Sequence, residues 1–168
     1  MKQVQGDGHM RLKISFSHWL ALLLPAALLA GAYGSQYFGG LFPCEMCWWQ
    51  RYPHYAAVAI AVLAFAVSHP GYRRALVALA ALAIATSGAI AGFHAGVEYG
   101  WWEGLTKCTS TISGSGDELL KSIMNAPLIR CDVAPWTLFD ISLAGFNFLL
   151  SFGGAIAIFA MIWRNPKH

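Results

Sequence analysis

Charged residues are scarce in this sequence, and their scarcity excludes an ordinary water-soluble domain. Only 11% of the 168 residues are Asp, Glu, Lys or Arg, whereas 57% are hydrophobic. Soluble domains carry about 25% charged residues, so the balance indicates a membrane protein. The sequence also lacks an internal repeat and a nucleic-acid-binding signature, so no nucleic-acid partner is expected.

Four stretches have few charges and are long enough to cross a bilayer as helices, which takes about 20 residues each. The predicted spans are residues 18–38, 51–70, 74–99 and 141–163. We therefore predict an all-α membrane protein, a four-transmembrane-helix bundle. Residues 14–168 are interpreted as one membrane domain. Residues 1–13 are interpreted as a cytoplasmic tail, because the first residues show no regular spacing of apolar side chains.

The first apolar stretch has an alternative interpretation as a cleaved signal peptide. Lys2, Arg11 and Lys13 precede it, and a basic start is typical of such peptides. The apolar run is longer than the core of a typical signal peptide, and three further spans follow. A retained span is therefore favoured.

The distribution of basic residues predicts the orientation, because Lys and Arg mark the cytoplasmic side. With four spans, both termini and the link between the second and third spans fall on that side. The outer side then carries two loops, residues 39–50 and 100–140. The cytoplasmic basic residues are Lys2, Arg11, Lys13, Arg73, Arg74, Arg164 and Lys167.

Cysteine is confined to these two outer loops. The four residues are Cys44, Cys47, Cys108 and Cys131. Disulfides can persist on the outer side of a bacterial membrane, because that side is oxidising. The natural pairing joins Cys44 to Cys47 and Cys108 to Cys131, although four cysteines allow three connectivities.

The segment PCEMCWWQR, residues 43–51, has the physical profile of a redox pair. Pro43 is expected at the first position of a helix, which places Cys44 and Cys47 in a first turn, where the helix dipole favours a thiolate. Arg51 adds positive charge on the face of Cys47. A lowered thiol pKa makes a cysteine more reactive and a better leaving group.

Two other interpretations of the cysteines stay open. A CxxC can be half of a zinc site, but the remaining ligands would lie far away in the sequence without a second CxxC, so no metal is predicted. A purely structural disulfide is the other interpretation. A bridge between Cys108 and Cys131 would stabilise the long loop by about 3 kcal/mol in the chain-entropy estimate.

His94 and Glu98, at the outer end of the third span, are a second candidate site. They are four residues apart, so they share one helix face, and polar groups in a membrane are functional candidates. Together with Arg51 they are expected to form a pocket for a flat ligand with polar groups. The alternative is an interfacial pair within an aromatic belt. The tryptophans that would border the pocket or form the belt are Trp48, Trp49, Trp101 and Trp102.

These features resemble the DsbB family of bacterial inner-membrane proteins that generate disulfide bonds. The resemblance covers nearly the whole chain after residue 13. Its most specific element is CxxCxxxR, formed here by Cys44, Cys47 and Arg51. The paired cysteines of the second loop are matched by Cys108 and Cys131.

The resemblance implies a relay between a soluble protein and a membrane quinone. Family members oxidise a periplasmic thioredoxin-like partner, DsbA, and pass two electrons to a quinone such as ubiquinone or menaquinone. Cys108 would form the mixed disulfide with the partner, and Cys131 would be its pair. Thiol–disulfide exchange would then carry the electrons to Cys44 and Cys47.

The resemblance also implies the quinone site. Cys47 would be the thiolate that meets the ring, Arg51 would support the developing charge, and His94 matches a family histidine near the quinone. Glu98 stands where the best-known members carry glutamine, which leaves the quinone type open. The alternatives are a relative with another thiol partner, a vitamin-K-epoxide-reductase-like enzyme, which is less favoured, and a non-catalytic scaffold with stapled loops.

Overall fold

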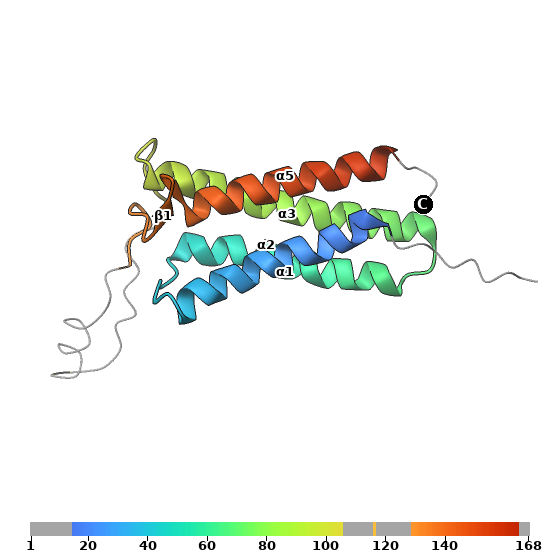
Figure 1. Ribbon diagram of the computed structural model, residues 1–168, viewed down its shortest axis with the longest axis horizontal. Coiled ribbons are helices and arrows are strands. Elements are labelled where there is room, and N and C mark those ends of the chain that lie inside the picture. Colours follow the sequence, from blue (N-terminus) through green and yellow to red (C-terminus); the bar gives the residue numbers. More distant parts are fainter. Residues whose placement is uncertain (1–14, 106–115, 117–128, 165–168) are drawn as a thin grey trace, which may run out of the picture.

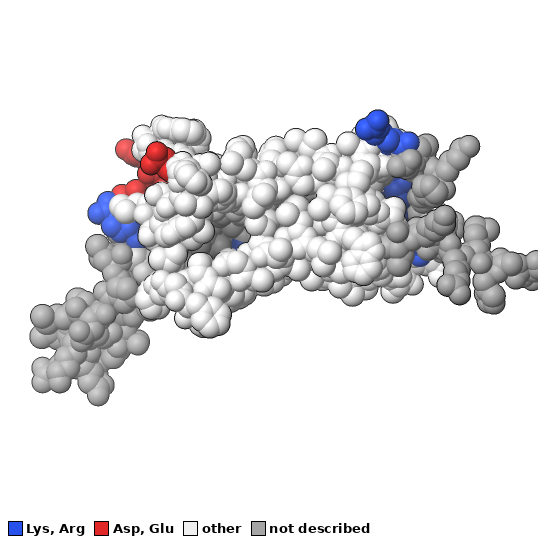
Figure 2. Space-filling view, viewed as in Figure 1, with Lys and Arg blue, Asp and Glu red and all other residues white. Residues whose placement is uncertain are grey.

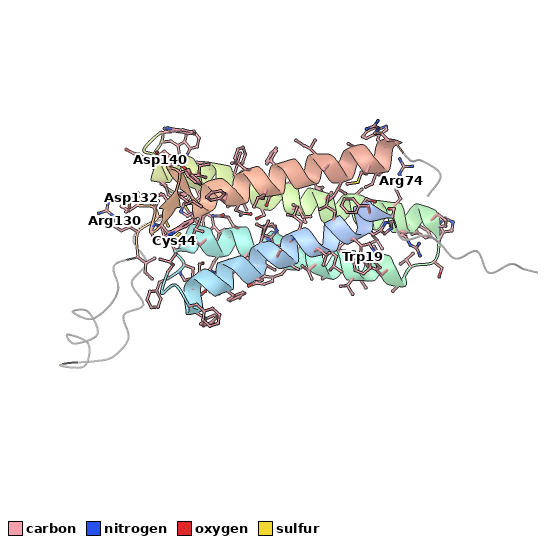
Figure 3. All side chains as sticks on the ribbon, in the orientation of Figure 1. Trp19, Cys44, Arg74, Arg130, Asp132 and Asp140 are labelled. Carbon is pink, nitrogen blue, oxygen red and sulfur yellow. The ribbon has the colours of Figure 1, made fainter. Side chains whose placement is uncertain are left out.

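The computed structural model describes residues 15–105, 116 and 129–164, and the long helices of this part lie side by side along one axis (Figure 1). They are α1 (Phe16–Tyr37), α2 (Glu45–Ala66), α3 (Pro70–Glu98) and α5 (Leu143–Arg164). The start of α1 and the end of α5 lie at the same end of the bundle (Figure 1). Cys44 lies at the opposite end from Arg74 (Figure 3).

Within the described residues, three helices are long and apolar enough to cross a membrane: α1, α3 and α5. The remaining long helix, α2, carries polar side chains in its first three turns, including Gln50, Arg51 and His54. Figure 2 shows charged side chains at the two ends of the molecule and an uncharged band between them. The structure is thus that of a helical membrane protein.

An alanine-rich core fills the half of the bundle away from the cysteines. Small side chains let helices approach closely inside a membrane, where packing drives association. Gly88 and Gly92 of α3 continue this close packing against α5, because an added Cβ at either position would lie 2.8 Å from the ring of Phe152 or Phe148. The buried residues of the core are Ala21, Ala57, Ala61, Ala64, Val77, Ala80, Ala81, Ile84, Ala155 and Ile158.

Helices α2 and α3 begin before the spans predicted for them, and each difference has a local cause. Helix α2 begins at Glu45 and ends at Ala66, because Cys44 is its N-cap and accepts a hydrogen bond from the backbone of the third helical residue. Pro43 therefore precedes the cap and is not the first helical residue. Helix α3 begins at Pro70, the position that proline favours, so Arg73 and the residue after it lie inside the helix rather than in a link.

A short hairpin departs from the all-α prediction. Strand β1 (Thr137–Leu138) pairs antiparallel with β2 (Ile141–Ser142). Phe139 and Asp140 between them have φ values of 50° and 60°, as a two-residue hairpin turn requires. The hairpin takes up the first two residues of the predicted fourth span, so α5 begins two residues later than expected.

One tyrosine ties the hairpin to the end of α3. The Tyr99 hydroxyl donates a hydrogen bond to the carbonyl of Asp140 at 3.1 Å and accepts one from the amide of Ser142 at 3.1 Å. The hairpin is thereby anchored at the cysteine end of the bundle. The segment that contains Cys131 comes just before it in the chain.

Candidate functional site

Two cysteines meet at the start of α2. The Cys44 thiol donates a hydrogen bond to the sulfur of Cys47, with 3.1 Å between the sulfurs. The amide of Cys47 donates to the sulfur of Cys44 at 3.3 Å. The pair is therefore in contact as two thiols, at the positive end of the α2 dipole.

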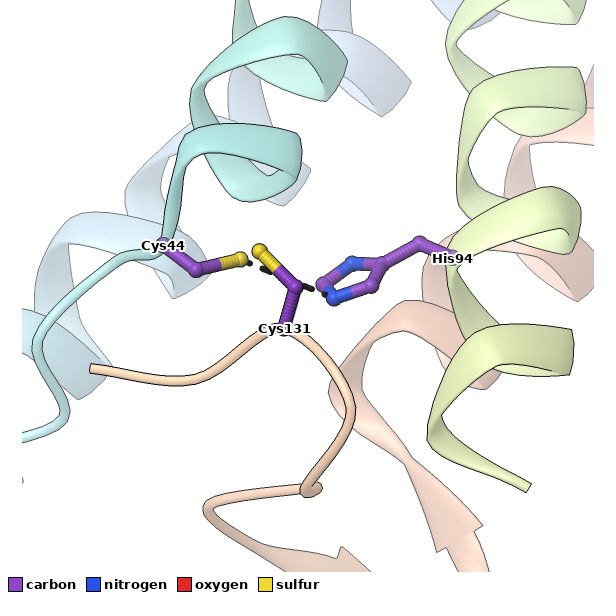
Figure 4. A group of neighbouring side chains, drawn as sticks. All are labelled: Cys44, His94 and Cys131. Carbon is purple, nitrogen blue, oxygen red and sulfur yellow. Dashed lines mark hydrogen bonds between the residues drawn. The ribbon is translucent and has the colours of Figure 1, made fainter. Parts of the chain in front are cut away.

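A third cysteine reaches the same place from the long loop. The sulfurs of Cys44 and Cys131 and a ring nitrogen of His94 lie within 4.8 Å of one another, and all three residues are buried (Figure 4). The structure thus brings a thiol of the second loop to the CxxC pair, which spacing in the sequence did not predict. Cys108 lies outside the described residues, so its pairing stays a prediction.

The hydrogen bonds of His94 fix which ring nitrogen carries the proton. The side-chain amide of Gln50 donates to Nδ1 of His94 at 2.8 Å and to the carbonyl of Met46 at 3.2 Å. Because Nδ1 accepts, the proton of the neutral ring lies on Nε2. That atom is 3.6 Å from the Cys44 sulfur and 3.7 Å from a carboxylate oxygen of Glu98. His94 can therefore donate a hydrogen bond from Nε2 to Cys44, which stabilises that sulfur when it leaves as a thiolate.

The two sulfurs of the CxxC pair are not equivalent. The hydrogen bond to Cys47 and burial of the thiol raise the pKa of Cys44 to about 12, although the neighbouring His94 opposes the shift. Cys44 therefore stays a thiol at neutral pH. Its hydrogen bond favours negative charge on the sulfur of Cys47, the role predicted for that residue.

Arg51 is buried between aromatic rings one turn beyond Cys47. Its guanidinium donates to the side chain of Gln36 at 2.8 Å and to the carbonyl of Ala32 at 3.3 Å. The guanidinium carbon lies 4.7 Å from the ring centres of both Tyr33 and Trp48. Such cation–π contacts favour a desolvated cation, so the charge of Arg51 is held at a fixed place inside the bundle.

A cavity of about 210 Å³ lies beside Cys47. Arg51, His94 and Glu98 line it together with Cys47, so the structure brings the three residues predicted to bind the cofactor to one cavity with one of the predicted catalytic cysteines. A second cavity, of about 260 Å³, shares Cys47, His94 and Glu98 and extends toward the Cys131 segment. The apolar wall of the first cavity includes Ala27, Leu28, Gly31, Leu143, Ala144 and Phe146.

The predicted tryptophans do not line this cavity. Trp48 contacts Arg51 from the side, and Trp49 packs against the buried cluster that contains Cys44. Trp101 is 69% exposed and Trp102 is 44% exposed. Trp102 stacks on Phe93 and donates a hydrogen bond to its carbonyl at 2.9 Å. These contacts are compatible with an aromatic belt at the membrane interface.

Sequence reasoning missed three polar residues of the cavity wall: Gln50, His54 and Asn147. The amide of Asn147 donates to Gln50 at 2.9 Å, and Nε2 of His54 lies 3.0 Å from the Asn147 oxygen and 2.9 Å from Ser87. For Gln50 and His54, the sequence carried a signal that could have identified them. Gln50 and His54 follow Cys47 by three and seven residues, one face of a helix, and polar groups in a span are functional candidates.

The helical membrane fold, the meeting of thiols at a helix N-terminus and the adjoining cavity define a membrane thiol–disulfide oxidoreductase as the class of protein. The chain belongs to the DsbB family, since the sequence model of the disulfide bond formation protein DsbB matches residues 15–161. A relative called disulfide bond formation protein B, from Methylococcus capsulatus, is 33% identical over 159 residues, which are 89% of this chain and 93% of that protein. No solved structure matches the chain significantly.

Family membership confirms the resemblance drawn from the cysteine pattern. It supports an enzyme that forms disulfide bonds and thereby assists protein folding.

Proposed function

We propose that this chain reoxidises a periplasmic thioredoxin-like protein of the DsbA type and passes the two electrons to a membrane quinone, either ubiquinone or menaquinone. The observation that carries the proposal is the meeting of Cys131 with Cys44, within 4.8 Å, beside a cavity lined by Cys47. A scaffold with stapled loops gives no reason for a thiol of one loop to lie against the CxxC pair of the other.

The proposed route begins at the second loop. A partner dithiol reduces the Cys108–Cys131 disulfide through a mixed disulfide on Cys108, and Cys131 is released as a thiolate. Cys131 then attacks the sulfur of Cys44, so that a Cys131–Cys44 bond forms, the Cys44–Cys47 bond breaks, and Cys47 leaves as a thiolate. The Cys131 sulfur lies within 4.8 Å of the Cys44 sulfur, and this proximity favours attack at Cys44.

The next exchange restores the second loop. The second thiolate of the partner attacks the sulfur that is bonded to Cys108, so the partner leaves with its own disulfide and Cys108 is released as a thiolate. Cys108 then attacks Cys131, so the Cys108–Cys131 bond reforms and Cys44 leaves. The Nε2 hydrogen of His94 lies on the side of Cys44, 3.6 Å from the sulfur, so it stabilises the leaving thiolate by a hydrogen bond. A proton taken up from the solvent then converts Cys44 to the thiol. The CxxC pair is then reduced, and the Cys44 thiol can donate to the Cys47 sulfur, a contact that the structure contains.

The cavity fits a quinone head group. Its wall combines apolar side chains of α1 and α5 with the buried donor Arg51, whose Nε has no hydrogen-bond partner among the residues that the structure describes. The quinone, when bound, would supply the two-electron acceptor for Cys44 and Cys47. Arg51, His94 and Glu98 would hold it, with Arg51 favouring the negative charge that develops near Cys47.

We further propose that all four long helices cross the bacterial inner membrane, with both termini in the cytoplasm and residues 39–50 and 100–140 in the periplasm. Helix α2 has 22 residues, the same length as α1 and α5, so it is long enough to cross. Arg74 lies at the end away from Cys44 (Figure 3). This agrees with the rule that basic residues stay on the cytoplasmic side.

The test is anaerobic mixing of the purified chain with a reduced DsbA-type partner and ubiquinone-1. Quinone absorbance and partner thiols are followed together. We expect one quinone to be consumed for each disulfide gained, and no consumption with Cys47→Ser. Quinone consumption that continues in the Cys47→Ser variant would contradict the relay, and absence of any consumption by the wild type would favour the stapled scaffold.

A further inference from the structure

Three residues that line the first cavity each have one buried polar atom without a hydrogen-bond partner among the residues described here. The atoms are Nε of Arg51, Nδ1 of His54 and Oε2 of Glu98, and all three residues line that cavity. Buried polar atoms are almost always paired in native proteins. Their presence around one cavity therefore points to a ligand that supplies the missing partners.

The hydrogen bonds around His54 determine what that ligand must offer. The Asn147 oxygen can only accept, and it lies 3.0 Å from Nε2 of His54. The Ser87 hydroxyl gives its hydrogen to the carbonyl of Gln50 at 2.8 Å, so it too accepts from Nε2 of His54, at 2.9 Å. Nε2 of His54 must therefore carry the proton, which leaves Nδ1 of the neutral ring as an acceptor only.

A quinone and its reduced form differ in this respect. The oxygens of a quinone are carbonyls that only accept hydrogen bonds. When Cys44 and Cys47 form their disulfide they give up two electrons, and uptake of two protons, one from the Cys44 thiol and one from the solvent, makes those oxygens the hydroxyls of a hydroquinone, which can donate. An acceptor such as Nδ1 of His54 can pair with the reduced form but not with the oxidised one.

We propose that His54 forms a second polar subsite of the cavity, which binds the hydroquinone hydroxyl remote from Cys47, and that the cavity thereby holds the reduced form more tightly than the quinone. Cys47 and His54 are seven residues apart on α2, about 10 Å along the axis, so a head group between them has one oxygen toward the thiols and one toward His54. Glu98, with its unpaired oxygen, lies at the thiol end.

The inference rests on the proposed function and gives it a thermodynamic consequence. A site that prefers the reduced form makes the bound quinone a stronger oxidant, because binding favours the state it fits. A tenfold preference would raise the potential of the bound two-electron couple by about 30 mV. His54 would thus favour electron flow out of the Cys44–Cys47 pair.

The test compares two constants in the full chain, assayed with a reduced DsbA-type partner. The KM for ubiquinone-1 and the inhibition constant for ubiquinol-1 are measured in the wild type, in His54→Gln and in His54→Phe. We expect both variants to raise the inhibition constant for ubiquinol-1 about tenfold, the effect of one lost hydrogen bond. The KM for ubiquinone-1 should change less than about threefold, because the quinone oxygen makes no bond to Nδ1.

The two variants separate binding from support of the fold. Gln keeps an amide donor for Asn147 and Ser87 but lacks the ring nitrogen Nδ1, whereas Phe removes both nitrogens. If only the Phe variant were impaired, His54 would serve the network alone and the proposal would be overturned. Equal changes in both constants, or no change in either, would overturn it as well.

Ser151→Ala is the matched control. The Ser151 hydroxyl donates to the same Asn147 oxygen at 2.8 Å, so the variant removes a hydrogen bond of the network without removing His54. We expect less than about a twofold change in the inhibition constant. A change as large as that of His54→Gln would assign the effect to the network and overturn the subsite.

Failure of the subsite can be told apart from failure of the proposed function. If the wild type reduces no quinone, the proposed function fails. Equilibrium dialysis of ubiquinol-1 and ubiquinone-1 against wild type and His54→Gln still measures whether the cavity binds the reduced form more tightly. Tighter ubiquinol-1 binding that is lost in His54→Gln supports the subsite. Equal affinities of the wild type for the two compounds overturn it.

Discussion

The two halves of the α2–α3 interface contrast sharply. In the half away from the cysteines, Ala57, Ala61 and Ala64 of α2 belong to one apolar cluster with Ala80 and Ala81 of α3. In the other half, the same two helices carry the CxxC pair and a network of buried polar side chains. The network comprises Gln50, His54, Ser87 and His94.

The alanine-rich half serves the fold, and the polar half serves the chemistry. Alanines allow close packing of helices and leave no polar group to satisfy. A buried polar atom left unpaired costs about 1–3 kcal/mol, and three of them surround the cavity of the polar half, among the residues described. A region that carries such a cost is retained for what it binds rather than for stability.

The largest effect in the polar half is expected from Cys131→Ser. Serine cannot exchange disulfides, so electrons from the partner no longer reach Cys44, and turnover with the reduced partner should fall by at least about 10³-fold. The step between the CxxC pair and the quinone should not depend on Cys131, and it can be isolated by reducing the Cys44–Cys47 pair chemically. Single-turnover oxidation of the reduced pair by ubiquinone-1 should keep the wild-type rate, as stopped-flow absorbance can show. Loss of both reactions would mean that Cys131 acts on the quinone step itself.

In the alanine-rich half we expect Ile84→Ala to alter stability and not catalysis. Ile84 is fully buried, and a truncated core isoleucine leaves a cavity that costs about 2 kcal/mol or more. The midpoint of thermal unfolding in detergent should fall, while the KM for ubiquinone-1 stays within about twofold of wild type.

Leu82→Ala is the control for that variant, because Leu82 is 56% exposed on the same helix and its loss should barely change the unfolding midpoint. A raised KM in Ile84→Ala would show that the two halves are coupled.

A smaller effect is expected from Arg51→Lys. Lysine keeps the charge but loses the planar fork, which here spans Gln36 and Ala32 and lies against two aromatic rings. The KM for ubiquinone-1 should rise about tenfold, with the unfolding midpoint close to wild type. Arg51→Ala should raise KM further, and identical kinetics in wild type and both variants would remove Arg51 from the quinone site.

The same contrast explains what the sequence could predict. The apolar stretches predict the helices because composition alone carries that signal. The CxxC spacing predicts the contact of Cys44 with Cys47, since three residues fix it locally. Cys131 could not be placed at the same site, because its approach depends on how the hairpin is tied to Tyr99.

The sequence did not predict the helix boundaries or the polar network, and the reasons differ. The start of α2 was missed because a cysteine side chain acts as its N-cap, a role usually taken by Ser, Thr, Asp or Asn. The hairpin was missed because Phe139 and Asp140 adopt left-handed φ values that glycine and asparagine usually supply. His54 and Asn147 were visible as polar residues in apolar helices, but their pairing across α2 and α5 is a tertiary contact.

The smallest effect is expected from pH on Cys44. The raised pKa of about 12 means that the thiol keeps its proton when pH rises through the range where an ordinary cysteine ionises, near 8.5. Below its pKa the thiolate fraction grows tenfold with each pH unit. Alkylation of Cys44 in the reduced protein, followed by mass spectrometry, should therefore keep rising from pH 6 to pH 10. Alkylation that levels off between about pH 9 and pH 10 would mean that Cys44 ionises like an ordinary thiol, and the two sulfurs of the pair would no longer be distinguished by their protons.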